Sequence, residues 1–170
     1  MLIRLENGIF ARAEDRFQPV GPDGAAPADG RPLLIGLALF LREGAALLDE
    51  GRVLGVALEP SERVEDLAYD LPRLALVALN FPKFRDGRPY SSAMLLRRRY
   101  GFPGEIRAVG DVLREQAFEL VRCGFDGFCP SDGSEPVDFA AAAGRYSHVY
   151  QAGADARPPA FVERSGPHGL

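Results

Sequence analysis

The sequence predicts a single α/β domain whose sheet is mainly parallel and is built from consecutive strand–helix units. Short apolar runs begin near residues 53, 74, 105 and 125, a spacing that fits parallel strands joined by helical crossovers. A chain of 170 residues fits one domain, whereas a complete eightfold barrel needs about 250 residues. We expect the α/β core to occupy residues 33–151. A flavodoxin-like open sheet and an incomplete TIM-like barrel both fit, because strand spacing does not fix strand order.

The N-terminal part predicts a hairpin followed by a loop. Within residues 1–17, Asn7-Gly8 stands between two apolar runs, which is typical of a tight β-hairpin. Residues 18–32 hold four prolines and three glycines without apolar periodicity, so we expect a mobile loop there. Residues 33–50 are expected to be helical.

Two nearly continuous apolar runs, residues 53–58 and 74–79, are typical of parallel strands that are covered on both faces. Ser61, which follows the first run, is expected to cap a helix that has acidic residues in its first turn. That helix would bury one stripe of residues at helical spacing. The stripe consists of Val64, Leu67, Ala68 and Leu71.

Similar signals continue after the second strand. Ser91 is expected to cap a helix that ends at Gly101, because glycine is favoured just after a helix. Residues 106–109 predict a third, shorter strand. Residues 111–123 predict a further helix, which Gly124 stops.

The C-terminal part predicts three more elements and a tail. Residues 125–129 predict a fourth strand, and a short helix is expected between Pro136 and Gly144. Residues 146–151 can add an edge strand. Residues 153–170 contain several prolines and are expected to form a loose tail.

Composition and cysteine usage predict a cytoplasmic protein without a membrane or nucleic-acid partner. The net charge of -4 disfavours nucleic-acid binding, no apolar run reaches the roughly 18 residues of a membrane span, and no signal-peptide core is visible. Cys123 should end a helix and Cys129 the following strand, which places the thiols near opposite ends of the sheet. We therefore expect two free thiols.

The loop at residues 80–92 is the longest and most polar of the predicted strand-to-helix loops, and parallel α/β folds bind ligands on such loops. Its candidate ligand-binding residues are Lys83, Arg85, Arg88, Tyr90 and Ser91. Because the loop leads into a helix N-terminus, where backbone N–H groups are free, it can bind a small anion. The alternative is that the cations are solvated surface charges and that Ser91 only caps the helix.

The next strand-to-helix connection adds two candidates, Asp111 and Gln116. Asp111 can cap the helix or accept a hydrogen bond from a ligand. Gln116 lies on the core-facing stripe, so its amide must either bond strand ends or face a pocket. Phe118, between Arg114 and Arg122, is either an ordinary exposed aromatic residue or an anchor for a partner.

Several common chemistries lack their sequence motifs. The chain has no G-x-G-x-x-G, no P-loop and no C-x-x-C, so neither a standard nucleotide site nor a thioredoxin-type redox site is expected. His148 and His168 are isolated, which argues against a zinc site or a histidine-based triad. Cys129 is either an inert buried residue or a catalytic thiol. The motifs therefore assign no catalytic residue, cofactor or metal.

Three segments in a fixed order resemble a known family. They are FPKFRDGR at 81–88, followed by Tyr90-Ser91, then RAVGDVLR at 107–114, then RCGFD at 122–126. They resemble a bacterial family of uncharacterised proteins commonly encoded beside assimilatory sulfite reductase, over about residues 53 to 151. Members are sometimes labelled probable oxidoreductases, but the resemblance supplies no catalytic residues. It implies a role in reductive sulfur assimilation.

The leading expectation is an accessory protein of sulfate or sulfite assimilation that binds a small anion or a pathway enzyme through the loop at 83–92. One alternative is a small oxidoreductase with an unrecognised flavin or nicotinamide site. Another is a non-catalytic interaction module whose loop and Phe118 face contact sulfite reductase.

Overall fold

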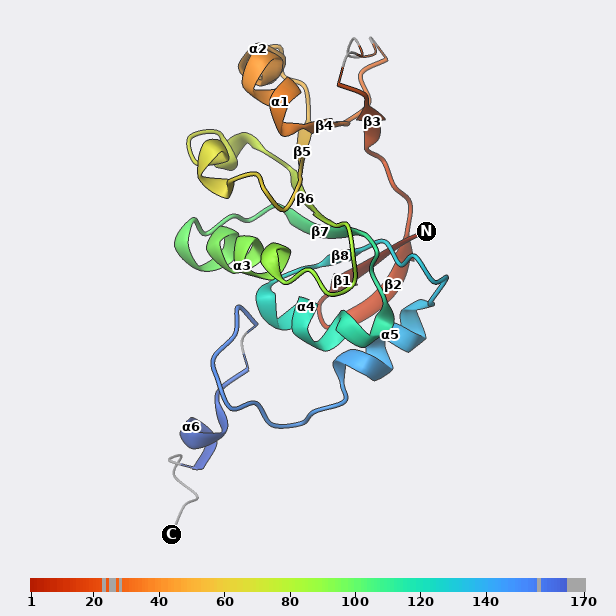
Figure 1. Cartoon of the computed structure of the whole chain (residues 1–170), viewed down its shortest axis with the longest axis vertical. Coiled ribbons are helices and arrows are strands. Elements are labelled where there is room, and N and C mark those ends of the chain that lie inside the picture. Colours follow the sequence, from red (N-terminus) through yellow and green to blue (C-terminus); the bar gives the residue numbers. More distant parts are fainter. Residues whose placement is uncertain (23, 25–26, 28, 156, 165–170) are drawn as a thin grey trace.

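The computed structural model describes residues 1–22, 24, 27, 29–155 and 157–164. One curled sheet, shaped like half a barrel, forms its centre (Figure 1). The strands are β1 (Leu2–Glu6), β2 (Ile9–Ala13), β3 (Gln18–Val20), β4 (Leu33–Gly36), β5 (Leu54–Leu58), β6 (Leu76–Phe81), β7 (Glu105–Gly110) and β8 (Gly127–Phe128). Their order across the 8-stranded sheet is β2-β1-β8-β7-β6-β5-β4-β3.

The strand order resolves the two alternatives that the spacing left open. From β3 to β8 the order in the sheet follows the order in the chain, and all neighbours are parallel. Only β1 departs from this, because it is antiparallel to both β2 and β8. The α/β class and the mostly parallel sheet are confirmed. A flavodoxin-like order is not, because such a sheet places its second strand outside its first.

Helical segments connect most of the strands. They are α1 (Leu37–Leu39), η1 (Phe40–Gly44), α2 (Ala45–Asp49), η2 (Val64–Leu67), η3 (Leu71–Arg73), α3 (Arg88–Met94), η4 (Leu95–Arg99), η5 (Arg114–Gln116), α4 (Ala117–Cys123), α5 (Pro136–Ala143) and α6 (Ala160–Arg164). Segments η1 and η4 are π-helical, and the other η segments are 3₁₀-helical. The predicted strand–helix alternation is therefore only partial: within the described residues no helix follows β3, and 3₁₀ turns replace the crossover between β5 and β6.

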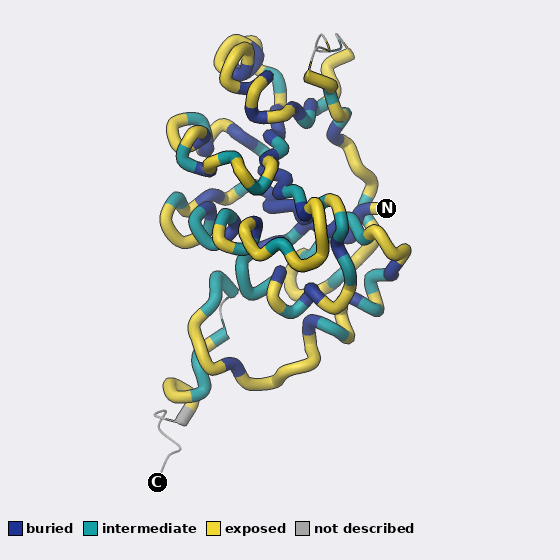
Figure 2. Tube along the Cα trace, in the orientation of Figure 1, coloured by how far each residue is buried: buried dark blue, intermediate teal, exposed yellow. Residues whose placement is uncertain are grey.

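The two faces of the sheet differ in character. On β7, Ile106 and Ala108 belong to the hydrophobic core under the helices, whereas Glu105 and Arg107 alternate with them and point to the other face. Figure 2 shows buried residues along the sheet and exposed residues on the outer sides of the helices and on the C-terminal arm, which comprises residues 144–155 and 157–164. Helix packing is thus confined mainly to one face.

The N-terminal hairpin is confirmed. Glu6 pairs with Ile9, which leaves a two-residue turn of Asn7 and Gly8 at φ values of 51° and 80°. Positive φ at both positions is the requirement of a type I′ turn, and Asn-Gly is the pair that adopts it most readily.

Two predictions between residues 18 and 50 are wrong in part. Residues 18–20 form the edge strand β3, and the predicted helix begins with a strand, β4, whose Leu33 and Ile35 are 0% and 1% exposed. The backbone of β4 is paired with β3 and β5, and these long-range partners are not visible in local propensity. The rest of the loop prediction falls partly on residues 23, 25, 26 and 28, which lie outside the described residues.

The helix predicted after Ser61 is also wrong. Its apolar residues are buried at Val64, Leu67 and Leu71, but they lie on the 3₁₀ segments η2 and η3, and Ala68 is exposed. The missing N–H of Pro72 affects only the carbonyl of Ala68, so it does not account for the 3₁₀ geometry of η2, which already begins at Val64.

The helices around the candidate loop begin elsewhere than predicted. Ser91 does not cap α3, since the N-cap is Gly87 and Ser91 lies inside the helix. The following helix starts as η5 and becomes α-helical only at Ala117. Both predicted ends are confirmed, by the positive φ of Gly101 (59°) and of Gly124 (97°).

The C-terminal part contains a confirmed helix, α5, and an arm. Residues 146–151 form no strand, because the only pairing there is an isolated bridge between Val149 and Pro159. The tail expected to be loose carries α6, while residues 156 and 165–170, with His168, lie outside the described residues. The arm is tied to α4, where Ala154 donates its N–H to the carbonyl of Arg122 at 2.6 Å.

Both cysteines are free thiols, as the sequence predicted. Among the described residues, no helix has the length and apolar character needed to cross a membrane.

Candidate functional site

The loop after β6 is held in place by two polar residues of the next strand–helix connection. Asp111 accepts the backbone N–H of Phe84 on its Oδ2 at 2.8 Å. Gln116 points its Nε2 at the carbonyl oxygen of the same residue at 3.4 Å and donates to the hydroxyl of Tyr90 at 3.1 Å. Three predicted site residues, Asp111, Gln116 and Tyr90, are therefore brought together, but they bind the loop itself.

The amide of Gln116 has partners within the chain on both of its ends. Its Oε1 accepts the N–H of Leu113 at 2.8 Å, and the residue is only 5% exposed. Burial raises the pKa of Tyr90, which favours its neutral hydroxyl as a partner for Gln116. These contacts support the structural role for Gln116 over a pocket-facing one.

Arg88 is already neutralised. Its Nε donates to Oδ1 of Asp86 at 2.9 Å, and the same carboxylate accepts the backbone N–H of Arg88 at 3.1 Å. The hydrogen bond from Arg88 lowers the pKa of Asp86, so the carboxylate stays ionised. The start of α3, where the sequence predicted an anion site, therefore already holds an anionic side chain of the chain itself.

Lys83, Phe84 and Arg85 form the part of the loop that projects outward, which we call the cationic tip. Lys83 and Arg85 are exposed and have no ion-pair partner among the residues that the structure describes. The ring of Phe84 is 40% exposed between them. The tip thus combines a fixed backbone with two free cations and one open aromatic ring.

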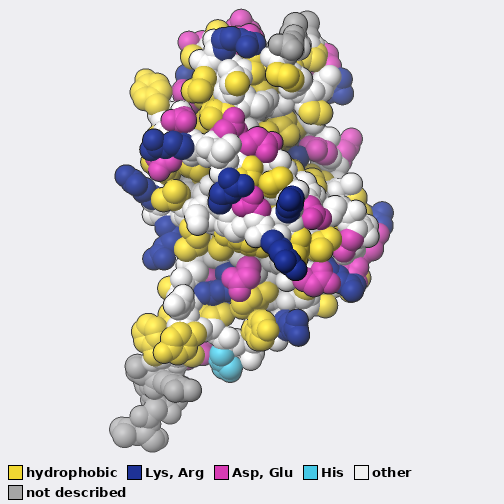
Figure 3. Space-filling view, in the orientation of Figure 1, with side chains coloured by type: hydrophobic (Ala, Val, Ile, Leu, Met, Phe, Trp, Pro, Cys, Tyr) yellow, Lys and Arg dark blue, Asp and Glu magenta, His cyan; other side chains and the backbone are white. Residues whose placement is uncertain are grey.

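The positive charge extends from the tip along the following helix. Residues 83–99 contain six cations and one acid, Asp86, although the whole chain has a net charge of -4. Arg98 and Arg99 are exposed and have no carboxylate partner within the described part of the chain. In Figure 3, Lys and Arg side chains lie over the middle of the molecule, around α3, among hydrophobic and acidic ones.

A shallow groove of about 500 Å³ runs along the same helix. Its lining residues are Tyr90, Ser91, Met94, Leu95, Arg98, Arg99 and Cys123. The groove was not predicted from the sequence, although Ser91, Met94, Leu95 and Arg98 stand at i, i+3, i+4 and i+7. That spacing marks one helical stripe, and here the stripe faces outward.

The thiols are not activated. Burial raises the pKa of Cys123 to about 11 and also raises that of Cys129. Nucleophilic chemistry needs a thiolate, so the inert alternative fits Cys129 better than a catalytic one. Among the described residues, no group of His, Cys, Asp and Glu side chains could hold a metal ion.

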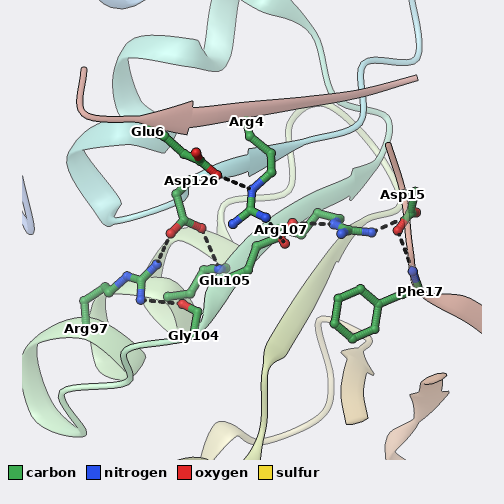
Figure 4. A network of polar contacts seen from close by, with 10 residues as sticks. Arg4, Glu6, Asp15, Phe17, Arg97, Gly104, Glu105, Arg107 and Asp126 are labelled. Carbon is green, nitrogen blue, oxygen red and sulfur yellow. Dashed lines mark hydrogen bonds and ion pairs between the residues drawn. The ribbon is translucent and has the colours of Figure 1, made fainter. Parts of the chain in front are cut away.

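A buried ionic network on the other face of the sheet was not predicted (Figure 4). The side chain of Arg107, 2% exposed, donates to Oε1 of Glu105 at 2.6 Å and to Oδ2 of Asp15 at 2.9 Å, and its guanidinium lies 5.6 Å from the ring centroid of Phe17. Arg4 of β1 reaches the other oxygen of Glu105 at 3.6 Å. These contacts tie β7 to the N-terminal segment.

In a second part of the network, Arg97 links the residue that follows α4 to the residue that precedes β7. Arg97 donates to the carbonyl of Gly104 at 2.7 Å and to Oδ2 of Asp126 at 2.8 Å (Figure 4). It also donates to the carbonyls of Phe102 and Gly124 at 2.6 and 2.9 Å. Burial raises the pKa of Asp126, and Arg97 opposes that effect. The network has partners for its charges within the fold, so its role is structural.

Phe118 is not a free anchor. Its ring meets that of Tyr146 edge-on, with centroids 5.0 Å apart, and the guanidinium of Arg122 lies over it at 5.8 Å. Tyr146 therefore packs on part of the surface that the sequence offered as an interaction face, and Phe118 remains half-buried.

The comparison with protein families adds one finding. A family described as "Bacterial protein of unknown function (DUF934)" matches residues 55–161, which include the cationic tip, the groove and α4 but not the N-terminal hairpin. No curated protein matches the chain. Because the match covers more than half of the chain, the protein belongs to the DUF934 family of bacterial proteins of unknown function.

Proposed function

We propose that the protein is a non-catalytic accessory protein of reductive sulfur assimilation in the cytoplasm. In this proposal the cationic tip docks on an acidic surface of a pathway enzyme, and that enzyme is sulfite reductase. The observation that carries the docking role is the tip itself, where Asp111 and Gln116 fix the backbone of Phe84 while its ring stays exposed between two free cations. The choice of pathway rests on the resemblance of residues 81–88, 107–114 and 122–126 described above.

A fixed backbone favours binding because less conformational entropy is lost on association. Aromatic and cationic side chains are also common at the energetic centre of interfaces. Lys83 and Arg85 have no internal acid to satisfy them among the described residues, so they remain available to steer an acidic partner.

A small anion is the second candidate ligand, and the free cations Lys83 and Arg85 favour it. Asp86 argues against it, because its carboxylate already accepts the first N–H of α3 and the guanidinium of Arg88. The oxidoreductase alternative draws no support from the thiols, since burial keeps both protonated at neutral pH.

The test is a binding titration between the purified chain and sulfite reductase. We expect Phe84→Ala to weaken binding about tenfold or more, as truncation of an interface anchor does. The matched control is Tyr69→Ala, because Tyr69 is 90% exposed on a different part of the surface. Replacing Lys83 and Arg85 together by glutamate should slow association, while the control Arg63→Glu should not.

Three outcomes would contradict parts of the proposal. Absence of any complex would reject sulfite reductase as the partner. A complex that is indifferent to Phe84→Ala would reject the tip as the docking element. Stabilisation by sulfite or sulfate at millimolar concentration, lost when Lys83 and Arg85 are replaced, would favour the small-anion function.

A further inference from the structure

The groove along α3 and η4 has the dimensions and direction of a helix-binding site. From Ser91 to Arg98 it extends over two turns, about 10 Å at the rise of a helix. Its floor includes Cys123 of α4, so it lies between two neighbouring helices that contact each other. Depressions between packed helices are where the side-chain ridges of a further helix fit.

The groove is apolar at its centre. Met94 and Leu95 are half-buried, and they form its middle together with the ring of Tyr90 and the thiol of Cys123. Burial disfavours ionisation of that thiol, which keeps the floor uncharged. An apolar stripe on the solvent side of a helix suits the anchors of an amphipathic helix, which stand at i, i+3, i+4 and i+7.

The rim of the groove is cationic at its η4 end, whereas Glu119 on the α4 side lies close enough to Tyr90 and Cys123 to raise their pKa values. Arg98 and Arg99 are exposed without a carboxylate partner among the described residues, and Asp86 is the only acid between residues 83 and 99. Charges across an interface are normally complementary, and like charges disfavour binding. An occupant of the groove should therefore present acidic residues where it meets Arg98 and Arg99.

We propose that this groove receives an acidic amphipathic helix of a protein partner, whose apolar side chains pack on Met94 and Leu95 and whose carboxylates face Arg98 and Arg99. The inference deepens the docking role proposed above, and it does not depend on which enzyme is docked. The groove and the cationic tip are joined by Tyr90 and Ser91, so one partner can contact both.

The thiol of Cys123 provides a reporter of occupancy. In a Cys129→Ser background it is the single cysteine, and its alkylation by excess iodoacetamide at pH about 9, followed at Cys123 by mass spectrometry, measures access to the groove floor. The probe is a synthetic helical peptide about five turns long, with leucines at i, i+3, i+4 and i+7 and glutamates beside them. The matched control peptide carries lysine at every glutamate position.

We expect the glutamate peptide to bind and to slow alkylation of Cys123 about tenfold at saturation, whereas the lysine peptide does neither. Met94→Glu and Arg98→Glu should each weaken the glutamate peptide about tenfold or more, and Leu41→Glu, a change at a 62% exposed residue of η1, should have no effect. Melting curves verify that each variant is folded. If Met94→Glu unfolds the protein, Arg98→Glu still tests the groove, because Arg98 is exposed and its replacement should leave the fold intact.

Failure of this inference is distinct from failure of the docking role. If neither peptide protects Cys123, or if both do so equally, the helix-binding groove is rejected, even where Phe84→Ala shows that the tip docks. A concentration-dependent dimer that Met94→Glu abolishes would instead assign the groove to a second copy of this chain and would overturn the proposal.

Discussion

Asp111 accepts the backbone N–H of Phe84 at 2.8 Å, so an aspartate just after β7 sets the position of the loop that follows β6. The neighbouring strands β6 and β7 are parallel, and Phe81 pairs with Gly110 at their ends. The contact therefore joins two loops on the same edge of the sheet. It also explains why a residue predicted to bind a ligand is engaged within the chain.

Removal of this contact should loosen the tip. We expect Asp111→Ala to lower the free energy of unfolding by about 1 kcal/mol, the typical net contribution of one hydrogen bond. Hydrogen exchange at the amide of Phe84 should become faster. Asp111→Asn is the control, because its amide oxygen can still accept the bond; unchanged exchange at Phe84 in the alanine variant would contradict this account.

Arg97 should tolerate no replacement, not even by lysine. Its guanidinium serves three carbonyls and Asp126 at once, which a single ammonium group cannot do. We expect Arg97→Lys to cost roughly 2 kcal/mol in urea unfolding, since two or more of these bonds are lost. The adjacent Arg98→Lys, at an exposed residue, should stay within about 0.5 kcal/mol; equal effects at the two positions would be evidence against the network.

Gly44 should be sensitive to the smallest possible enlargement. A Cβ atom there would lie 2.4 Å from Cδ2 of Phe40, inside the π-helical segment η1. We expect Gly44→Ala to destabilise the fold by up to about 2 kcal/mol, because an overpacking cost of roughly 1–3 kcal/mol is offset by a gain in helix propensity of about 1 kcal/mol. Gly87→Ala is the matched control, because a Cβ at Gly87 meets nothing within 4 Å. A stabilised Gly44→Ala variant would show that Phe40 can move aside.

Cys123 should react slowly in the folded protein. Its pKa of about 11, compared with an ordinary value of 9.0, leaves on the order of a hundredfold less thiolate near neutral pH. Alkylation should therefore be far slower in the native state than in urea. Because the folded pKa is the higher one, the stabilising effect of the protonated thiol is present below pH 9 and is lost as the pH rises towards about 11. Equal native and unfolded rates at pH 8 would contradict the buried thiol.

Most of the sheet could be predicted from the sequence, and specific residues show why. Local signals agree with the fold at β5 and β6, which are continuous apolar runs, and at Gly101 and Gly124, which end helices with positive φ. The strand β4 was mistaken for a helix because Leu33 and Ile35 gain their burial from neighbouring strands. Such pairing is a property of the tertiary fold and is not written in local propensity.

The candidate site was predicted only as a location. Composition and position identified the polar loop after β6, but hydrogen-bond partners depend on which residues the fold brings together. Gln116 and Tyr90 are 26 positions apart, and their contact exists only because α3 and α4 pack side by side. The outward stripe of Met94 and Leu95 was visible as a period in the sequence, yet the period does not say which side of the helix faces solvent.

The pairing of β1 with β8 constrains the order in which the strands can fold during synthesis. Ile3 lies opposite Phe128, and this antiparallel contact spans most of the chain, whereas the other sheet neighbours are consecutive in sequence. During vectorial synthesis the N-terminal hairpin leaves the ribosome long before its docking strand exists. An isolated hairpin is marginally stable at best in water. We therefore expect the nascent hairpin to stay only partly folded, and accessible to chaperone binding, until residue 128 has left the ribosome.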